Sequence, residues 1–248
     1  MEPTLIWILV SVLGGFVLAL LLGRGLVPAL RALKAGQSIR EVGPKWHQGK
    51  AGTPTMGGIV FILSSLLCIV TGWHAMRETG DYKHLLVLAL ALMFGLIGFA
   101  DDFIKVKKKR NLGLTGLQKL VLQVLAACLF LAGMHFTNAL TYDLYIPFVR
   151  EPLVHIPPLV YLALSVFIIV GCVNAVNLTD GIDGLATGVT LPVMLFFTLV
   201  SMTAKQWGLA TFPATLVGAL GGFLFYNFYP AKTFMGDTGS LYLGGAVC

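Results

Sequence analysis

Long apolar runs separated by short charged loops dominate the sequence and limit what it can fold into. Seven runs lie near residues 5–23, 56–73, 85–100, 117–134, 157–175, 186–202 and 209–229, and an eighth begins near Leu241. A helix crosses a bilayer with about 20 apolar residues. Only 11% of the residues are charged, against roughly 25% in a soluble domain. We therefore predict an all-α, polytopic transmembrane helical bundle with about seven complete spans and the start of an eighth.

The sequence gives no sign of a second domain. We find no internal repeat, no long linker and no separate soluble part, so residues 1–248 are expected to form a single integral membrane domain. Residues 138–158 contain TYDLYIPF between two apolar runs. This composition predicts a loop with a short extended or hairpin piece.

The lysines and arginines predict how the chain is oriented. The odd-numbered loops between the runs hold thirteen of them and the even-numbered loops hold four. Basic loops face the cytoplasm, so we expect the odd loops in the cytoplasm and the N-terminus outside. With the basic residues placed between apolar runs, the net charge of +6 favours anionic lipid headgroups or a phosphorylated substrate as partners, and no nucleic acid.

Five aspartates stand at the ends of apolar runs, all at odd-numbered loops. They are Asp101, Asp102, Asp180, Asp183 and Asp237. Three separate pieces of chain therefore deliver carboxylates to one face of the membrane. An acid at a helix C-terminus opposes the helix dipole, and two adjacent acids repel each other. The pair Asp101 and Asp102 therefore indicates a bound cation or proton.

Asp180 and Asp183 are three residues apart, and Asn174 and Asn177 precede them with the same spacing. A helix starting between the two acids would place them near one face. Ordinary structural roles also fit part of this pattern. Asp180 could cap the next helix, and an asparagine could form a local turn.

Asp237 lies in the stretch FMGDTGSL, next to Gly236 and close to Gly239. Glycines permit tight backbone and close approach of a ligand. The following helix could bind a phosphate at its N-terminus, or Thr238 or Ser240 could simply cap it. Both interpretations remain open from the residues alone.

The set of aspartates, without clustered His or Cys, favours a cation that prefers oxygen ligands, such as Mg²⁺. Lys50, Lys105 and the run Lys107–Arg110 lie at the same face, although the bias towards basic cytoplasmic loops alone would explain many of them. Carboxylates, a cation and lysines together suggest phosphoryl transfer on a membrane-associated substrate.

Four motifs occur in a recognisable order. They are KAGTPTMGG (50–58), ADDFIKV (100–106), NAVNLTDGIDGLA (174–186) and FMGDTGSL (234–241). Together they resemble the phospho-N-acetylmuramoyl-pentapeptide transferases, a branch of the polyprenyl-phosphate N-acetylhexosamine-1-phosphate transferases. The match covers essentially the whole chain, and KAGTPTMGG is the stronger pointer to this branch.

The resemblance implies a specific reaction. Members of the family move phospho-MurNAc-pentapeptide from UDP-MurNAc-pentapeptide to undecaprenyl phosphate, giving lipid I and UMP, with Mg²⁺ as cofactor. This is the first membrane step of peptidoglycan synthesis, in the bacterial inner membrane with the active site facing the cytoplasm. The family has ten transmembrane helices and usually forms homodimers.

The resemblance also assigns roles to residues. Asp101 would be the base that deprotonates the lipid phosphate, supported by Asp102, and Asp237 would be catalytic and hold the Mg²⁺. The substrate-binding residues would be Lys50, Thr55, Lys119, Asn174, Asp180, Asp183 and Asn227. The family pattern continues past FMGDTGSL with further helices and a histidine-rich loop, so we expect the domain to be incomplete at its C-terminus.

Three other functions are also compatible with the sequence. A sibling transferase could use a different UDP-sugar. An ion-coupled secondary transporter also has glycine-interrupted helices and intramembrane acids, but here the acids gather at one interface rather than at the midplane. An inactive membrane scaffold is the third alternative.

Overall fold

The computed structural model describes residues 3–33, 52–77, 80, 82–108, 112–144 and 154–248. Its helices are α1 (Pro3–Ala32), α2 (Ile59–Ser65), α3 (Leu67–Met76), α4 (Lys83–Lys108), α5 (Gly116–Phe136), α6 (Pro158–Thr179), α7 (Leu185–Thr203), α8 (Trp207–Asn227) and α9 (Gly236–Val247). Two short strands, β1 (Asp143–Leu144) and β2 (Val154–His155), pair antiparallel. This pairing confirms the predicted hairpin piece.

The all-α membrane bundle is confirmed. Six of the described helices (α1 and α4 to α8) are long and apolar enough to cross a membrane. The second apolar run forms α2 and α3, which meet at Leu66 with helical backbone angles (φ −61°, ψ −16°). Together they extend for about 27 Å at 1.5 Å per residue, close to the roughly 30 Å of bilayer hydrocarbon. The chain is therefore a multi-pass membrane protein.

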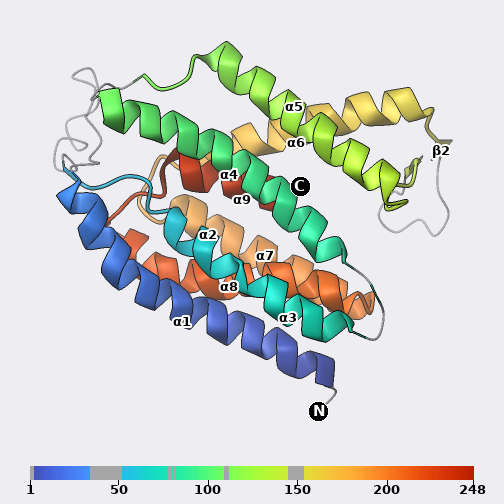
Figure 1. The fold of residues 1–248 in the computed structure, drawn as a ribbon, viewed down its shortest axis with the longest axis horizontal. Coiled ribbons are helices and arrows are strands. Elements are labelled where there is room, and N and C mark those ends of the chain that lie inside the picture. The colour runs from blue at the N-terminus through green and yellow to red at the C-terminus, as the bar shows by residue number, and fades with distance from the viewer. Residues whose placement is uncertain (1–2, 34–51, 78–79, 81, 109–111, 145–153) are drawn as a thin grey trace.

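Helix α9 lies inside the bundle (Figure 1). It packs against α4 and α6 and also touches α2 and α7, and its residues from Thr238 to Ala246 are buried. Small residues allow this close packing, because a Cβ on Gly244 would lie 2.6 Å from the Cα of Val173 and one on Gly245 would lie 2.9 Å from the ring of Phe94. Packing of small residues between helices is the usual solution in membranes.

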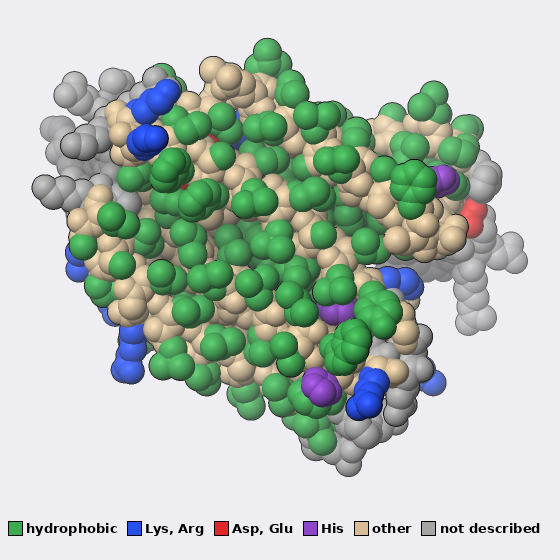
Figure 2. All heavy atoms as spheres, in the orientation of Figure 1, with side chains coloured by type: hydrophobic (Ala, Val, Ile, Leu, Met, Phe, Trp, Pro, Cys, Tyr) green, Lys and Arg blue, Asp and Glu red, His purple; other side chains and the backbone are tan. Residues whose placement is uncertain are grey.

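Apolar side chains are spread over the face of the bundle that Figure 2 shows. Leu96, Leu129 and Phe167, for example, are 66%, 66% and 74% exposed. A soluble protein rarely exposes so much contiguous apolar surface, whereas in a bilayer this surface contacts lipid.

The elements that carry the aspartates meet at one end of the bundle. The last turns of α4 contact the start of α9, where a Cβ on Gly98 would collide with the carbonyl oxygen of Asp237. The segment before α2 joins them, because Gly57 N–H and Gly58 N–H donate to the carbonyls of Phe234 and Met235. Sequence positions far apart are therefore held together by backbone contacts.

Candidate active site

Three carboxylates form an acidic cluster, defined here as Asp101, Asp102 and Asp237. The first two belong to α4 and are 1% and 2% exposed, whereas Asp237 is half-buried in the first turn of α9. One oxygen from each lies within 4.8 Å of the others. Burying charges this close together is costly unless they are paired, so the partners of each oxygen matter.

The two α4 carboxylates are each fixed by a donor from outside the helix. The backbone N–H of Leu114 donates to Oδ1 of Asp101 at 2.7 Å. The backbone N–H and the hydroxyl of Thr238 both donate to Oδ2 of Asp102, at 2.9 and 2.7 Å. Helix α9 begins after Met235 without a side-chain cap, so Thr238 orients Asp102 instead of capping its own helix.

Asp237 is fixed in the same manner by α6. The side-chain amide of Asn177 donates to Oδ1 of Asp237 at 2.9 Å and also contacts Oγ of Ser240 at 2.7 Å. One oxygen of every carboxylate in the acidic cluster is therefore held by a neutral donor. The other oxygen of each is left to face the centre of the cluster.

The ammonium of Lys105 occupies that centre. Its Nζ lies 2.5 Å from Oδ2 of Asp101, 2.7 Å from Oδ2 of Asp237 and 3.6 Å from Oδ1 of Asp102. These are the three oxygens that the neutral donors leave unused. A single ammonium group thus contacts all three converging carboxylates.

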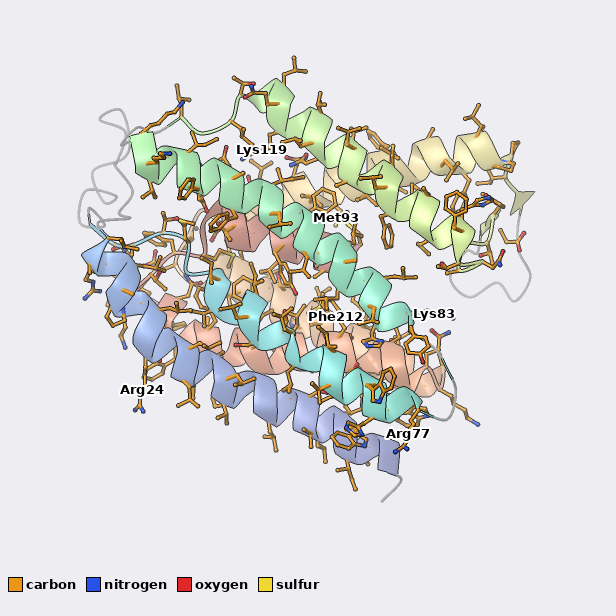
Figure 3. The ribbon with its side chains drawn as sticks, viewed as in Figure 1. Arg24, Arg77, Lys83, Met93, Lys119 and Phe212 are labelled. Atoms are coloured by element: carbon orange, nitrogen blue, oxygen red, sulfur yellow. The ribbon has the colours of Figure 1, made fainter. Side chains whose placement is uncertain are left out.

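Lys119 supplies a second positive charge from α5. Its Nζ lies 2.8 Å from Oδ2 of Asp237 and 3.6 Å from Oδ2 of Asp101, and Figure 3 shows it between α5 and α4. A capping box between Thr115 and Gln118 starts α5 and places Lys119 in its first turn. The local sequence therefore fixes where this lysine lies.

Asp180 and Asp183 lie in the turn between α6 and α7. Burial, together with the negative charges of Asp237 and Asp102, raises the pKa of Asp180 to about 8. Asp180 is therefore close enough to the acidic cluster for the charges of Asp237 and Asp102 to affect its protonation. Helix α7 begins after Gly184, at φ +73° and without a side-chain cap, so Asp180 does not cap it. Asp183 accepts from the N–H of Ala231 at 3.1 Å.

Two of the predicted substrate-binding asparagines have protein partners away from the acidic cluster. Asn174 pairs with Gln123 at 2.7 Å. Asn227 is buried, accepts from the hydroxyl of Thr187 at 2.8 Å and donates to the carbonyl of Thr233 at 3.0 Å. In the described part of the chain they connect helices and a loop around the site.

The last two predicted residues come from the segment before α2. Thr55 is buried beside the acidic cluster, because a Cβ on Gly236 would lie 2.6 Å from its Oγ1 and 2.5 Å from Oδ2 of Asp102. Gly236 has φ +69°, so both its backbone and this crowding require glycine. Lys50 lies outside the described residues.

Comparisons with known proteins show which family the sequence is similar to. Residues 84–248 match the family model of glycosyl transferase family 4, and residues 50–62 match the phospho-N-acetylmuramoyl-pentapeptide-transferase signature 1. The chain is 47% identical to the phospho-N-acetylmuramoyl-pentapeptide-transferase of Bacillus subtilis (strain 168), over 97% of this chain and 73% of the relative. The transferases of that name from Carboxydothermus hydrogenoformans and Clostridium acetobutylicum are 47% and 46% identical, over 96% and 97% of this chain and 73% and 74% of theirs.

The chain belongs to the phospho-N-acetylmuramoyl-pentapeptide transferase family. Membership of this transferase family confirms the resemblance carried by the four motifs, and the structure brings three of them together at the acidic cluster. The segment of the first motif that the structure describes contacts the same place through Thr55.

Sequence reasoning left two contacts of this transferase site off its list of site residues. Lys105 lies four residues after Asp101 and three after Asp102, a spacing that places side chains on one helix face. This signal was available in the sequence. Asn177 could not be chosen over Asn174 without the structure, because both stand near the end of the same apolar run.

The acidic cluster fits a metal ion by its donor chemistry. Three carboxylate oxygens converge, and an ammonium group already lies where they meet. Oxygen ligands of this kind suit Mg²⁺ or Mn²⁺. A metal held by Asp101, Asp102 and Asp237 would compete with Lys105 for the same oxygens.

Proposed function

We propose that the acidic cluster is the catalytic centre at which this chain transfers phospho-MurNAc-pentapeptide from UDP-MurNAc-pentapeptide to undecaprenyl phosphate, giving lipid I and UMP. The family relationship supports the reaction. The single observation that carries the assignment of the site is the convergence of three carboxylates and two lysines at one end of a membrane bundle.

The chemistry joins two phosphates, so repulsion between their negative charges has to be overcome. Lys105 and Lys119 are partly exposed, with 31% and 20% of their side chains accessible. Their ammonium groups can turn from the carboxylates to the diphosphate of the sugar donor. Positioned positive charge of this kind provides much of the catalysis in phosphoryl transfer.

Asp101 is the proposed base. Its Oδ2 faces the centre of the acidic cluster beside the ammonium groups of Lys105 and Lys119, while the backbone N–H of Leu114 holds the other oxygen. It would take the proton from the acceptor phosphate. An oxygen of that phosphate then forms a bond to the phosphorus next to the sugar, and the bond from this phosphorus to the oxygen of UMP breaks.

Asp237 is proposed to be the principal ligand of Mg²⁺, with Asp102 beside it, and Asp101 is left to act as the base. The ion, when bound, supplies positive charge to the phosphate oxygens. Asp102 is kept in place by Thr238 and Asp237 by Asn177. These neutral donors would orient the carboxylates towards the ion.

We further propose that this end of the bundle faces the cytoplasm in a bacterial inner membrane, that the N-terminus lies outside and that the protein forms homodimers. The excess of basic residues in the odd-numbered loops supports the orientation, and the family resemblance supports the dimer. Lys50, Thr55, Asn174, Asp180, Asp183 and Asn227 are proposed to shape the substrate site.

The direct experiment measures transfer of labelled sugar phosphate to undecaprenyl phosphate by the detergent-solubilised protein, with UDP-MurNAc-pentapeptide or UDP-N-acetylglucosamine as donor. We expect transfer from the first donor, and loss of transfer when divalent metal is chelated. Transfer only from the second donor would instead support a sibling transferase. No transfer from either, together with ion-driven uptake into vesicles, would support a transporter.

A further inference from the structure

A groove on the outside of the bundle runs between α1 and α8. It has a volume of ≈ 800 Å³, within the roughly 300–1,000 Å³ of ligand sites in proteins. Its lining includes Phe16, Leu20 and Arg24 from α1, and Gly221, Phe225 and Phe228 from the α8 side. Apart from Arg24, these side chains are apolar, and Gly221 leaves the floor of the groove open.

One cation, Arg24, lines this groove, and a second, Lys232, lies beside two of its lining rings. Arg24 is exposed and follows directly after Gly23, which packs against the ring of Tyr226. The ammonium of Lys232 lies 4.4 Å from the centre of the Phe225 ring and 5.9 Å from that of Tyr226. Arg24 therefore lines the groove together with Phe225 and Tyr226, the two rings beside which Lys232 lies. Among the described residues, no carboxylate forms an ion pair with either cation.

The expected position of Arg24 along the membrane normal is that of a lipid headgroup. The apolar part of α1 from residue 5 to residue 23 extends for about 28 Å at 1.5 Å per residue, close to the roughly 30 Å of the hydrocarbon layer. We therefore place Arg24 at the boundary of the membrane, with α1 continuing beyond it to Ala32, at the end of the bundle that carries the acidic cluster. Figure 3 shows it projecting outward from α1, with Arg77 at the opposite end of the bundle.

The groove is distinct from the proposed catalytic centre. Helix α1 packs mainly against α8, α3 and α2, whereas the acidic cluster belongs to α4 and α9 and its lysines to α4 and α5. A phosphate group held by Arg24 on the outer side of α1 would not lie against Asp101. The lipid acceptor of the transfer reaction therefore belongs elsewhere.

We propose that this groove binds an anionic bilayer phospholipid, with an acyl chain along the apolar lining and the phosphate between Arg24 and Lys232. The apolar lining suits any acyl chain, and the two cations, which pair with no carboxylate of the described residues, select a negative headgroup over a zwitterionic one. A basic side chain near an anionic lipid surface contributes roughly 1 kcal/mol, or about fivefold in affinity. Two of them predict a preference of roughly thirtyfold.

The test is titration of the delipidated protein in detergent, followed by native mass spectrometry. Dioleoyl phosphatidylglycerol and dioleoyl phosphatidylcholine are compared, because they share acyl chains and differ in headgroup charge. We expect the first to bind more tightly. Arg24→Gln and Lys232→Gln should each reduce the preference about fivefold. Arg77→Gln, which removes a cation from the opposite end, should leave it unchanged.

A second variant tests the apolar part independently. A Cβ on Gly221 would lie 3.5 Å from the Phe16 ring, an ordinary contact, so Gly221→Leu fills the groove without displacing backbone. We expect it to weaken binding of both lipids equally, while thermal unfolding stays as in the parent.

Three outcomes would overturn the proposal. The two lipids could bind equally well. Arg77→Gln could lower the preference as much as Arg24→Gln. Finally, undecaprenyl phosphate could displace phosphatidylglycerol at equal concentration while Arg24→Gln raises the KM for this acceptor, which would make the groove the acceptor site instead.

Discussion

The Nζ of Lys105 lies 2.7 Å from Oδ2 of Asp237, a residue 132 positions later in the chain. The same ammonium contacts Asp101 and Asp102. Lys105 thus holds α4 and α9 together and neutralises the oxygens that a metal ion would use. Removing the ammonium group should therefore free these oxygens for a metal ion and also remove a contact between α4 and α9.

We predict that Lys105→Met tightens binding of divalent metal and at the same time impairs transfer. Unit charges 4 Å apart interact by about 4 kcal/mol at an effective dielectric constant of 20, and the partial exposure of Lys105 reduces this, so a gain in Mn²⁺ affinity on the order of tenfold is expected. Mn²⁺ binding can be followed by electron paramagnetic resonance.

Lys108→Met is the matched control for this variant, because Lys108 is exposed on the last turn of the same helix. It should leave Mn²⁺ affinity unchanged. Equal or weaker Mn²⁺ binding by Lys105→Met would show that the lysine and the metal do not compete for the acidic cluster.

Asp101→Asn, Asp102→Asn and Asp237→Asn should each lose most of the transferase activity. Each change keeps the size of the side chain and removes its charge, and a positioned acid or base commonly contributes about a hundred- to ten-thousandfold. Rates are measured with labelled UDP-MurNAc-pentapeptide. Lys108→Ala should have a much smaller effect, and losses below about tenfold in all three variants would exclude the acidic cluster as the catalytic centre.

Much of the fold could be predicted because apolar runs of about 20 residues have few structural options in a bilayer. The ends of the helices were predicted less accurately than their existence. Helix α1 continues to Ala32, beyond the predicted end at residue 23, because Leu26, Val27 and Leu30 extend the apolar pattern past Arg24. The break at Leu66 between α2 and α3 was not predicted, because no proline or glycine lies near it in the sequence.

The composition of the site was only partly predictable, because sequence shows which polar residues stand near a helix end and not the direction of their side chains. Asn174 and Asn177 have the same chemistry, yet one pairs with Gln123 and the other with Asp237. The convergence of α4, α6 and α9 decides between them. The roles proposed for Asn174 and Asn227 in substrate binding stay predictions.

Gly218→Ala should destabilise the bundle. Helices α1 and α8 approach so closely there that a Cβ on Gly218 would collide with the carbonyl oxygen of Val12. Overpacking typically costs about 1–3 kcal/mol, which thermal unfolding in detergent can detect. Gly221→Ala, one turn further on the same helix, meets only ordinary contacts and serves as the control. Equal melting temperatures for both variants would contradict the close approach.

The orientation can be tested by labelling single cysteines in an otherwise unreactive background. Lys108→Cys at the end of α4 and Lys205→Cys between α7 and α8 are both exposed and belong to an odd and an even loop. We expect an impermeant maleimide to label Lys205→Cys in intact cells and Lys108→Cys only after permeabilisation. Labelling of both from outside would refute the proposed topology.

The final prediction separates the role of Asp237 from that of Asp101. Asp237 is the more exposed of the two, with 20% of its side chain accessible against 2% for Asp101, and two lysines contact its Oδ2. As the principal metal ligand, its loss should weaken Mg²⁺ binding, so additional Mg²⁺ should restore part of the rate in Asp237→Asn. Asp101→Asn should keep a half-saturating Mg²⁺ concentration close to that of the parent and remain slow at saturation, because more metal does not replace a missing base. Titrating the transfer rate with Mg²⁺ for both variants distinguishes these roles. An unchanged half-saturating concentration for Asp237→Asn, with a raised one for Asp101→Asn, would reverse the two assignments.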